Sequence, residues 1–265
     1  METVYVGPSM VKAKGRGQVK KKPVRKEGRW LAGVDGCPAG WVTVSKCLAD
    51  GSLEVELIRK LEDLFRPPRE VVLAGVDMPI GLLSQARPGG RECDRAARKT
   101  LGPSKSSSVF SPPVRKALRA GSYEEALRLN RESSGHGLGI SRQAFGLLPK
   151  LRELESIITP GRQRVIREVH PELSFWAMNN GRAVREKKSG IKGLAKRGDL
   201  LSAHGLDIYD KARPRWPKRM VGDSDILDAA AALFSAERIY FGQAVRLPAG
   251  EPPRDEKGLL MEIWY

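Results

Sequence analysis

The chain has 265 residues and a formal net charge of +16, because 47 Lys and Arg outnumber 31 Asp and Glu. Hydrophobic residues make up 40% of the chain, which is enough apolar material for a folded core and excludes a wholly disordered protein. No run approaches the ~18 apolar residues that cross a bilayer, and the N-terminus has no apolar signal core, so we expect a cytoplasmic protein without a membrane partner. The positive charge favours an anionic partner.

The first 29 residues are strongly basic and contain few large apolar side chains. Such a segment cannot offset the entropy of ordering by burial, so residues 1–29 are predicted to form a disordered basic arm. Two interpretations stay open for this arm, a nucleic-acid-binding element and a solubilising leader. The folded domain is expected to cover residues 30–265.

Strands dominate the first part of this domain. Apolar runs and alternating β-branched residues predict three strands in succession, over residues 30–34, 41–47 and 53–58. A short helix is predicted over residues 61–65, closed by two prolines. The following run, residues 71–76, is apolar on both faces, which is typical of a strand inside a sheet that helices cover.

Helices dominate the rest of the chain. Helices are predicted over residues 91–101, 123–132, 141–158, 173–178 and 224–240, and a further strand over 165–169. The last helix is Ala-rich and begins at Asp223 or Ser224. We interpret residues 83–161 as a helical insertion within one domain. The order of elements predicts an α/β fold with a mixed sheet.

Four aspartates form the main candidate site. Asp35 ends the first strand, Asp77 follows the strand at 71–76, and Asp225 and Asp228 are three residues apart on the final helix. Carboxyl ends of neighbouring strands meet at one crevice, and helical residues i and i+3 share a face, so these side chains are expected to converge. Their mutual repulsion favours a bound divalent cation, and hard oxygen ligands favour Mg²⁺ or Mn²⁺. The chemistry expected of such a centre is metal-assisted phosphoryl transfer.

Further polar residues are weaker candidates. Glu168 and Glu172 flank His170 just after a strand, so either acid is a candidate for completing the metal cluster or orienting a water. A solvent-facing strand position for Glu168 and a helix-start position for Glu172 are equally good interpretations, and His170 fits a hydrogen-bonded turn. The candidates for substrate phosphate contact are Lys105, Arg115, Arg142, Gln143, Lys150 and His170, together with the basic stretch 187–197. Taken singly, each basic segment fits a solvated charged face as well.

Several spaced blocks resemble a family of domains of unknown function that are predicted to be RNase H-like nucleases. The matching blocks are Gly33-Val34-Asp35-Gly36-Cys37 with Gly40-Trp41, Val76-Asp77-Met78-Pro79-Ile80-Gly81-Leu82, Arg91-Glu92-Cys93-Asp94 with Ala97-Arg98, Ser108-Val109-Phe110 with Pro113 and Arg115, Ser141-Arg142-Gln143 with Lys150, Arg167-Glu168-Val169-His170-Pro171-Glu172, and Asp223-Ser224-Asp225 with Asp228-Ala229. They span roughly residues 31–240.

This resemblance implies an RNase H-like sheet with three antiparallel strands first, parallel strands after them and helices on both faces. It also implies that Asp35 is the first-strand acid, Asp77 the acid of the later strand, and Asp225 and Asp228 the acids of the final helix. Because Asp223 and Asp225 are separated by Ser224, the ligand among these two stays open.

The leading hypothesis from the sequence is a Mg²⁺- or Mn²⁺-dependent nuclease that acts on RNA or DNA. The first alternative is a nucleic-acid-binding protein of the same fold without turnover, because basic charge alone explains binding. A third hypothesis is a small-molecule phosphoryl-transfer enzyme, which shares this core but usually offers Thr or Ser where the first turn here has Cys37 and Pro38. The choice of RNA or DNA and the oligomeric state are not indicated.

Overall fold

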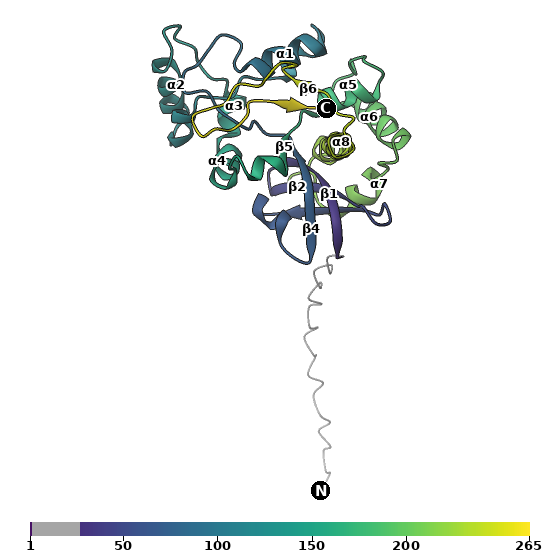
Figure 1. Cartoon of the computed structure of the whole chain (residues 1–265). Helices are drawn as coiled ribbons and strands as arrows, with labels where there is room; N and C mark the ends of the chain where they lie inside the picture. The colour runs from purple at the N-terminus through teal and green to yellow at the C-terminus, as the bar shows by residue number, and fades with distance from the viewer. Residues whose placement is uncertain (2–26) are drawn as a thin grey trace.

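A mixed five-stranded sheet organises the chain (Figure 1). The computed structural model describes residue 1 and residues 27–265, so most of the predicted basic arm lies outside the described residues. The strands are β1 (Gly28–Cys37), β2 (Gly40–Cys47), β3 (Leu53–Ile58), β4 (Arg69–Val76) and β5 (Ile166–Glu168), in the order β3-β2-β1-β4-β5. Strands β1, β2 and β3 are antiparallel to one another, whereas β4 pairs parallel to β1 and β5 parallel to β4. The predicted RNase H-like fold class is confirmed.

The helical elements follow the predicted order with some differences. They are η1 (Leu61–Phe65), α1 (Glu92–Leu101), η2 (Ser106–Ser108), η3 (Arg115–Arg119), α2 (Tyr123–Glu132), α3 (Arg142–Gly146), α4 (Leu148–Ile157), η4 (Arg162–Arg164), α5 (Pro171–Met178), α6 (Ile191–Ala203), α7 (Tyr209–Ala212), η5 (Arg213–Arg215) and α8 (Asp223–Tyr240). Among the described residues, no helix is both long and apolar enough to span a membrane.

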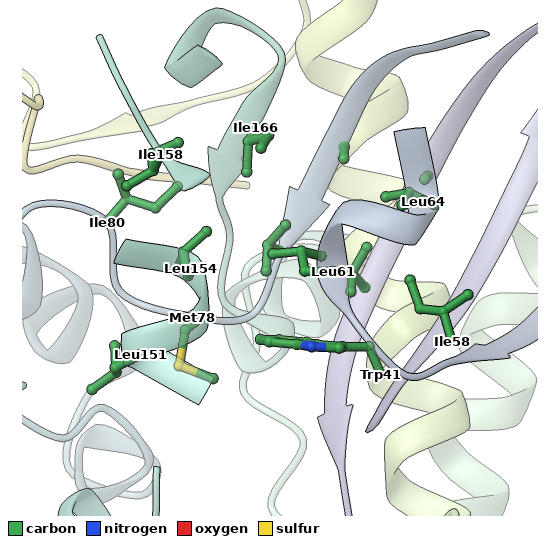
Figure 2. Close-up of a cluster of buried hydrophobic side chains, with 14 of the residues drawn as sticks. Trp41, Ile58, Leu61, Leu64, Met78, Ile80, Leu151, Leu154, Ile158 and Ile166 are labelled. Carbon is green, nitrogen blue, oxygen red and sulfur yellow. The ribbon is translucent and has the colours of Figure 1, made fainter. Parts of the chain in front are cut away.

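Alternation along the strands produces a core on each face of the sheet. On one face, Trp41 packs with Leu61 from η1 and Leu151 from α4 (Figure 2). On the other face, Leu31 and Val42 belong to a second core that includes residues of α6 and α8. Figure 1 shows α4 on one side of the sheet and α8 on the other, as predicted for helices on both faces.

Helix α8 lies directly on the sheet because two glycines leave room for its backbone. Gly33 of β1 and Gly75 of β4 are register partners. A Cβ at Gly33 would lie 2.0 Å from the backbone nitrogen of Leu233, and a Cβ at Gly75 would lie 2.6 Å from the carbonyl oxygen of Ala232. Any side chain at either position would push the helix away, so this glycine pair fixes the distance between α8 and the two central strands.

Two helical segments and the chain terminus differ from the sequence expectation. The predicted helix 141–158 is divided into α3 and α4 near Leu147, and residues 191–212 form α6 and α7, which were not predicted because this basic, Gly-containing stretch lacks a clear apolar period. The C-terminal strands β6 (Arg246–Leu247) and β7 (Ile263–Trp264) pair with each other. Trp264 also bridges to Val169, so this tail docks beside β5.

Candidate functional site

A cavity of about 260 Å³ lies beyond the carboxyl ends of the central strands. Asp35 and Asp77 line it, as do Glu172 and Lys188. The strand register explains the position of the first two, because each comes directly after one member of the paired residues Val34 and Val76. Open α/β sheets bind ligands at this edge, so the cavity lies where the sequence predicted a site.

Asp228 joins the two strand aspartates from helix α8. It directly precedes Ala229, whose carbonyl oxygen lies against Gly33, and it is 1% exposed. Asp35 is 8% exposed, and its pKa is affected by the charges of both Asp228 and Asp77. The structure therefore brings together three of the four predicted metal ligands, one each from β1, the end of β4 and α8.

These three carboxyl groups are poorly solvated, and their pKa values reflect it. Burial, with repulsion from Asp228 and Asp77, raises the pKa of Asp35 well above its ordinary value. Burial raises the pKa of Asp77 to about 6, and that of Asp228 to about 6, although Lys188 opposes both shifts. A perturbed acidic cluster in a cleft is a physical indicator of a functional site.

One cation from a loop lies among these carboxylates. Lys188 precedes α6, and its ammonium group pairs with Oδ2 of Asp228. Burial alone would lower the pKa of Lys188, but the charges of Asp228, Asp35 and Asp77 raise it well above its ordinary value. The other carboxylate oxygen of Asp228, Oδ1, is buried and has no hydrogen-bond partner among the described residues.

The oxygen ligands at this site suit a hard divalent cation, but the ammonium of Lys188 now occupies one of them. Asp35, Asp77 and Asp228 supply carboxylate oxygens, and the orphaned Oδ1 of Asp228 is a free acceptor within the described chain. As the side chains are now placed, no group of three or more His, Cys, Asp or Glu residues in the described part of the chain is arranged to hold a metal ion. A bound cation would thus require the carboxylates to move closer together and the ammonium of Lys188 to leave Asp228.

Asp225 has a different local role from Asp228. Its Oδ2 accepts a hydrogen bond of 2.8 Å from the backbone nitrogen of Gly222, and its Oδ1 accepts one of 3.3 Å from Ser224 Oγ, so it caps α8. Asp225 still raises the pKa of Asp35 through its charge, as the smallest contribution. Asp223 pairs with Arg213 and Lys218, at 3.0 and 2.6 Å.

Glu168 lines the cavity and belongs to a buried ionic network. Arg91 donates from Nη2 to Glu168 Oε1 at 2.6 Å and from Nη1 to Oε2 at 2.8 Å, and its Nη2 also contacts Asp94 at 2.6 Å. The backbone nitrogen of Ile80 donates to the same Glu168 carboxylate at 2.6 Å. These bonds occupy both oxygens, so the network holds the loop after β4 against β5 and α1.

Glu172 and His170 border the cavity from the start of α5. Glu172 is buried and accepts a hydrogen bond of 2.6 Å from Arg197 of α6. His170 Nε2 lies 3.4 Å from the carbonyl oxygen of Ser108, its Nδ1 has no partner among the described residues, and burial lowers its pKa. The imidazole is therefore expected to be neutral near pH 7, which suits a hydrogen bond better than a charge contact.

The predicted phosphate-contacting residues are dispersed. Of that set, Gln143, His170 and Lys188 of the basic stretch line the cavity. The other four basic side chains contact neighbouring protein groups. Lys105 Nζ donates to Glu186 O at 3.2 Å, and Arg115 pairs with Glu155 and Asp255. The Arg142 guanidinium lies 4.4 Å from the Tyr123 ring centre, and Lys150 donates to Gly40 O and lies over Trp41.

Sequence reasoning did not single out four charged residues that shape the site. Arg91 and Asp94 have the i, i+3 spacing of a helix-start pair, which was a detectable signal for an ion pair but not for its partner Glu168. Arg197 was part of the basic stretch, with no indication that it is 1% exposed and bonded to Glu172. Lys188 was in the same stretch, where the sequence does not show which of several Lys and Arg residues reaches the acidic cluster.

Comparison with known proteins gave one match. The family described as Protein of unknown function (DUF429) matches residues 33–253. This range contains every aspartate of the cluster as well as Lys188 and Glu168. No curated protein and no solved structure matches the chain.

Proposed function

For this chain, which belongs to the DUF429 family of proteins of unknown function, we propose a metal-dependent nuclease activity that hydrolyses phosphodiester bonds of RNA or DNA. The convergence of Asp35, Asp77 and Asp228 from three separate elements at the ligand-binding edge of the sheet carries this proposal. Two buried carboxylates and a half-buried one are costly to a fold when they lie close together, and binding a cation offsets that cost.

In this proposal the three aspartates hold Mg²⁺ or Mn²⁺. When bound, the metal would polarise a phosphoryl oxygen of the substrate and would lower the pKa of a bound water toward neutral pH. The chain's own contribution is positional. The glycine pair under α8 fixes Asp228 beside Asp35 and Asp77, and the Arg91–Glu168 pair holds part of the cavity lining in place. Asp225 contributes negative charge that acts on Asp35, and Glu172 and His170 are candidates for orienting substrate or water.

The proposed substrate is nucleic acid because of the charge around the acidic site. The chain carries a net charge of +16, and the segment that delivers Lys188 to the cavity also has the exposed side chains of Arg182, Arg185 and Lys187. Lys105 contacts the backbone of this segment at Glu186. A phosphate backbone that enters the cavity would pass these cations, so binding is expected to weaken linearly in log affinity with log salt.

A cleavage screen tests the activity. We expect the full chain with Mn²⁺ to cleave at least one of single-stranded RNA, single-stranded DNA, duplexes, hybrids or branched junctions, and we expect chelation to abolish cleavage. The variant Asp77→Asn should be inactive with an unchanged far-UV circular dichroism spectrum, whereas Asp199→Asn, an exposed position on α6, should be fully active. No cleavage of any substrate, or equal activity in Asp77→Asn, would contradict the proposal.

One observation favours a second candidate, a nucleic-acid-binding protein without turnover. Lys188 already neutralises Asp228, so the acidic cluster has a counter-charge without a metal. This candidate predicts salt-sensitive binding of oligonucleotides that is unaffected by chelation and by Asp35→Asn. A fluorescence anisotropy titration with and without chelator separates it from the nuclease proposal.

A further inference from the structure

Lys188 is delivered to the acidic cluster by a tightly seated turn. The backbone nitrogen of Gly190 donates to the carbonyl oxygen of Lys187 at 3.0 Å, which closes the turn just before α6. The turn lies against Gly193, where a Cβ would come within 2.0 Å of that same oxygen. Helix α6 is in turn tied to α5 by the buried Arg197–Glu172 pair. The backbone below Lys188 is therefore held in place, and its side chain is the movable part.

The two partners of the ion pair differ strongly in exposure. The side chain of Lys188 is 43% exposed, whereas that of Asp228 is 2% exposed. A lysine ammonium on its flexible four-carbon stem can leave for water, where it is well hydrated. Asp228 sits on the helix that contacts the glycine pair and cannot follow. Breaking the pair thus means that Lys188 swings outward while the carboxylate stays.

The charges facing Lys188 are those of the proposed metal ligands. Asp228, Asp35 and Asp77 act on it, so one monovalent ammonium faces three carboxylates. Oδ1 of Asp228 is left without a partner among the described residues, although it is buried. The ammonium of Lys188 pairs with Oδ2 of Asp228 and carries a single charge, whereas a divalent cation can bind several carboxylate oxygens at once. The arrangement therefore leaves unused ligand capacity for such a cation.

We propose that Lys188 is a built-in cation that closes the acidic cluster and competes with a divalent metal ion for Asp228, so that metal binding requires the lysine side chain to move out toward solvent. This inference rests on the proposed function, because it assumes that the cluster binds a metal at all. Lys188 then acts as a gate that balances part of the charge of the carboxylates without a resident metal. Because the side chain of Lys188 is 43% exposed, the displaced ammonium would face solvent, where an incoming phosphate is a suitable partner.

Calorimetric titration of Mn²⁺ into the full chain tests the competition. We expect Lys188→Met to bind Mn²⁺ with a Kd at least about tenfold lower than that of the wild type, because the competing charge is gone. Lys187→Met is the matched control, since it removes the same charge from the same turn at an exposed position. It should bind Mn²⁺ like the wild type. Lys188→Arg keeps a cation in place and should not bind more tightly than the wild type.

A second readout covers the case in which the loss of Lys188 weakens the fold. We expect saturating Mn²⁺ to raise the melting temperature of Lys188→Met by more than that of the wild type and of Lys187→Met, because a tighter ligand stabilises the folded state more. Equal Mn²⁺ affinity in wild type and Lys188→Met would overturn the inference and leave the proposed function standing. Weaker binding in Lys188→Met would overturn it too, by making Lys188 a support of the metal. If neither protein binds Mn²⁺, the proposed function fails and the inference fails with it.

Discussion

Asp77 is expected to destabilise the metal-free protein at neutral pH. Its pKa in the folded chain is about 6, against an ordinary value of 3.8. Between these values the folded state binds more protons than the unfolded state, so stability falls as the pH rises through this window and the full penalty remains above about pH 6. The variant Asp77→Asn has no such penalty. It should therefore be more stable than the wild type at pH 7.5, with little difference near pH 4.

The size of this effect follows from the same values. Each pKa unit corresponds to about 1.4 kcal/mol, so the difference sets an upper value of about 3 kcal/mol. Solvent around the half-buried carboxyl group screens part of it, and we expect a gain of about 1–3 kcal/mol in the free energy of unfolding. For a chain of this length that corresponds to a rise of about 2–6 °C in melting temperature.

Urea unfolding in the presence of a chelator measures this gain. Wild type, Asp77→Asn and Asp199→Asn are compared at pH 4.0 and pH 7.5. The control position is exposed on α6, so its change should be small at both values. If Asp77→Asn is less stable than the wild type at pH 7.5, the carboxylate is a structural element, and the idea that the cluster sacrifices stability for ligand binding is refuted.

Three further changes test other parts of the account. Arg91→Met should lower the free energy of unfolding by about 3–5 kcal/mol in urea, because it leaves the buried Glu168 carboxylate without its partner, and the added change Glu168→Gln should recover part of that loss. Gly33→Ala should unfold at much lower urea concentration or fail to fold, because its Cβ would lie 2.0 Å from the backbone of α8, whereas Gly198→Ala has open space in a helix and should gain about 0.5–1 kcal/mol. Removing the charge of Arg185 should weaken oligonucleotide binding in anisotropy titrations and should reduce the slope of log affinity against log salt by about one, because Arg185 is expected to contact a phosphate. An unchanged slope would place the nucleic acid elsewhere.

The strands of the sheet could be predicted because their patterns are local. The run at 71–76 is apolar on both faces and becomes β4, and the apolar and β-branched runs before it become β1, β2 and β3. Helix α6 was missed because its glycines and basic residues hide the apolar positions that pack inward. What decides its folding is tertiary contact, including the buried Arg197–Glu172 pair, which no local pattern contains.

In the candidate site, too, some residues could be placed from the sequence and others could not. Asp35, Asp77 and Asp228 could be found from the sequence, since their positions relative to strand ends and to the final helix fix where they lie. The i, i+3 rule placed Asp225 on the same helix face, but it cannot tell a capping acid from one that faces the strands. Lys188 depends on a loop conformation set by Gly193, far beyond the reach of spacing rules.

Calorimetric titration of Mn²⁺ into the wild type and into Asp35→Asn tests the central claim most directly. Asp35 faces the charges of Asp228, Asp77 and Asp225, so it is the member of the cluster that a divalent cation should relieve most. The account predicts saturable binding to the wild type that Asp35→Asn loses, with an unchanged circular dichroism spectrum. Absence of binding to the wild type, or equal binding by both proteins, would contradict it and would favour a protein that binds nucleic acid without cleaving it.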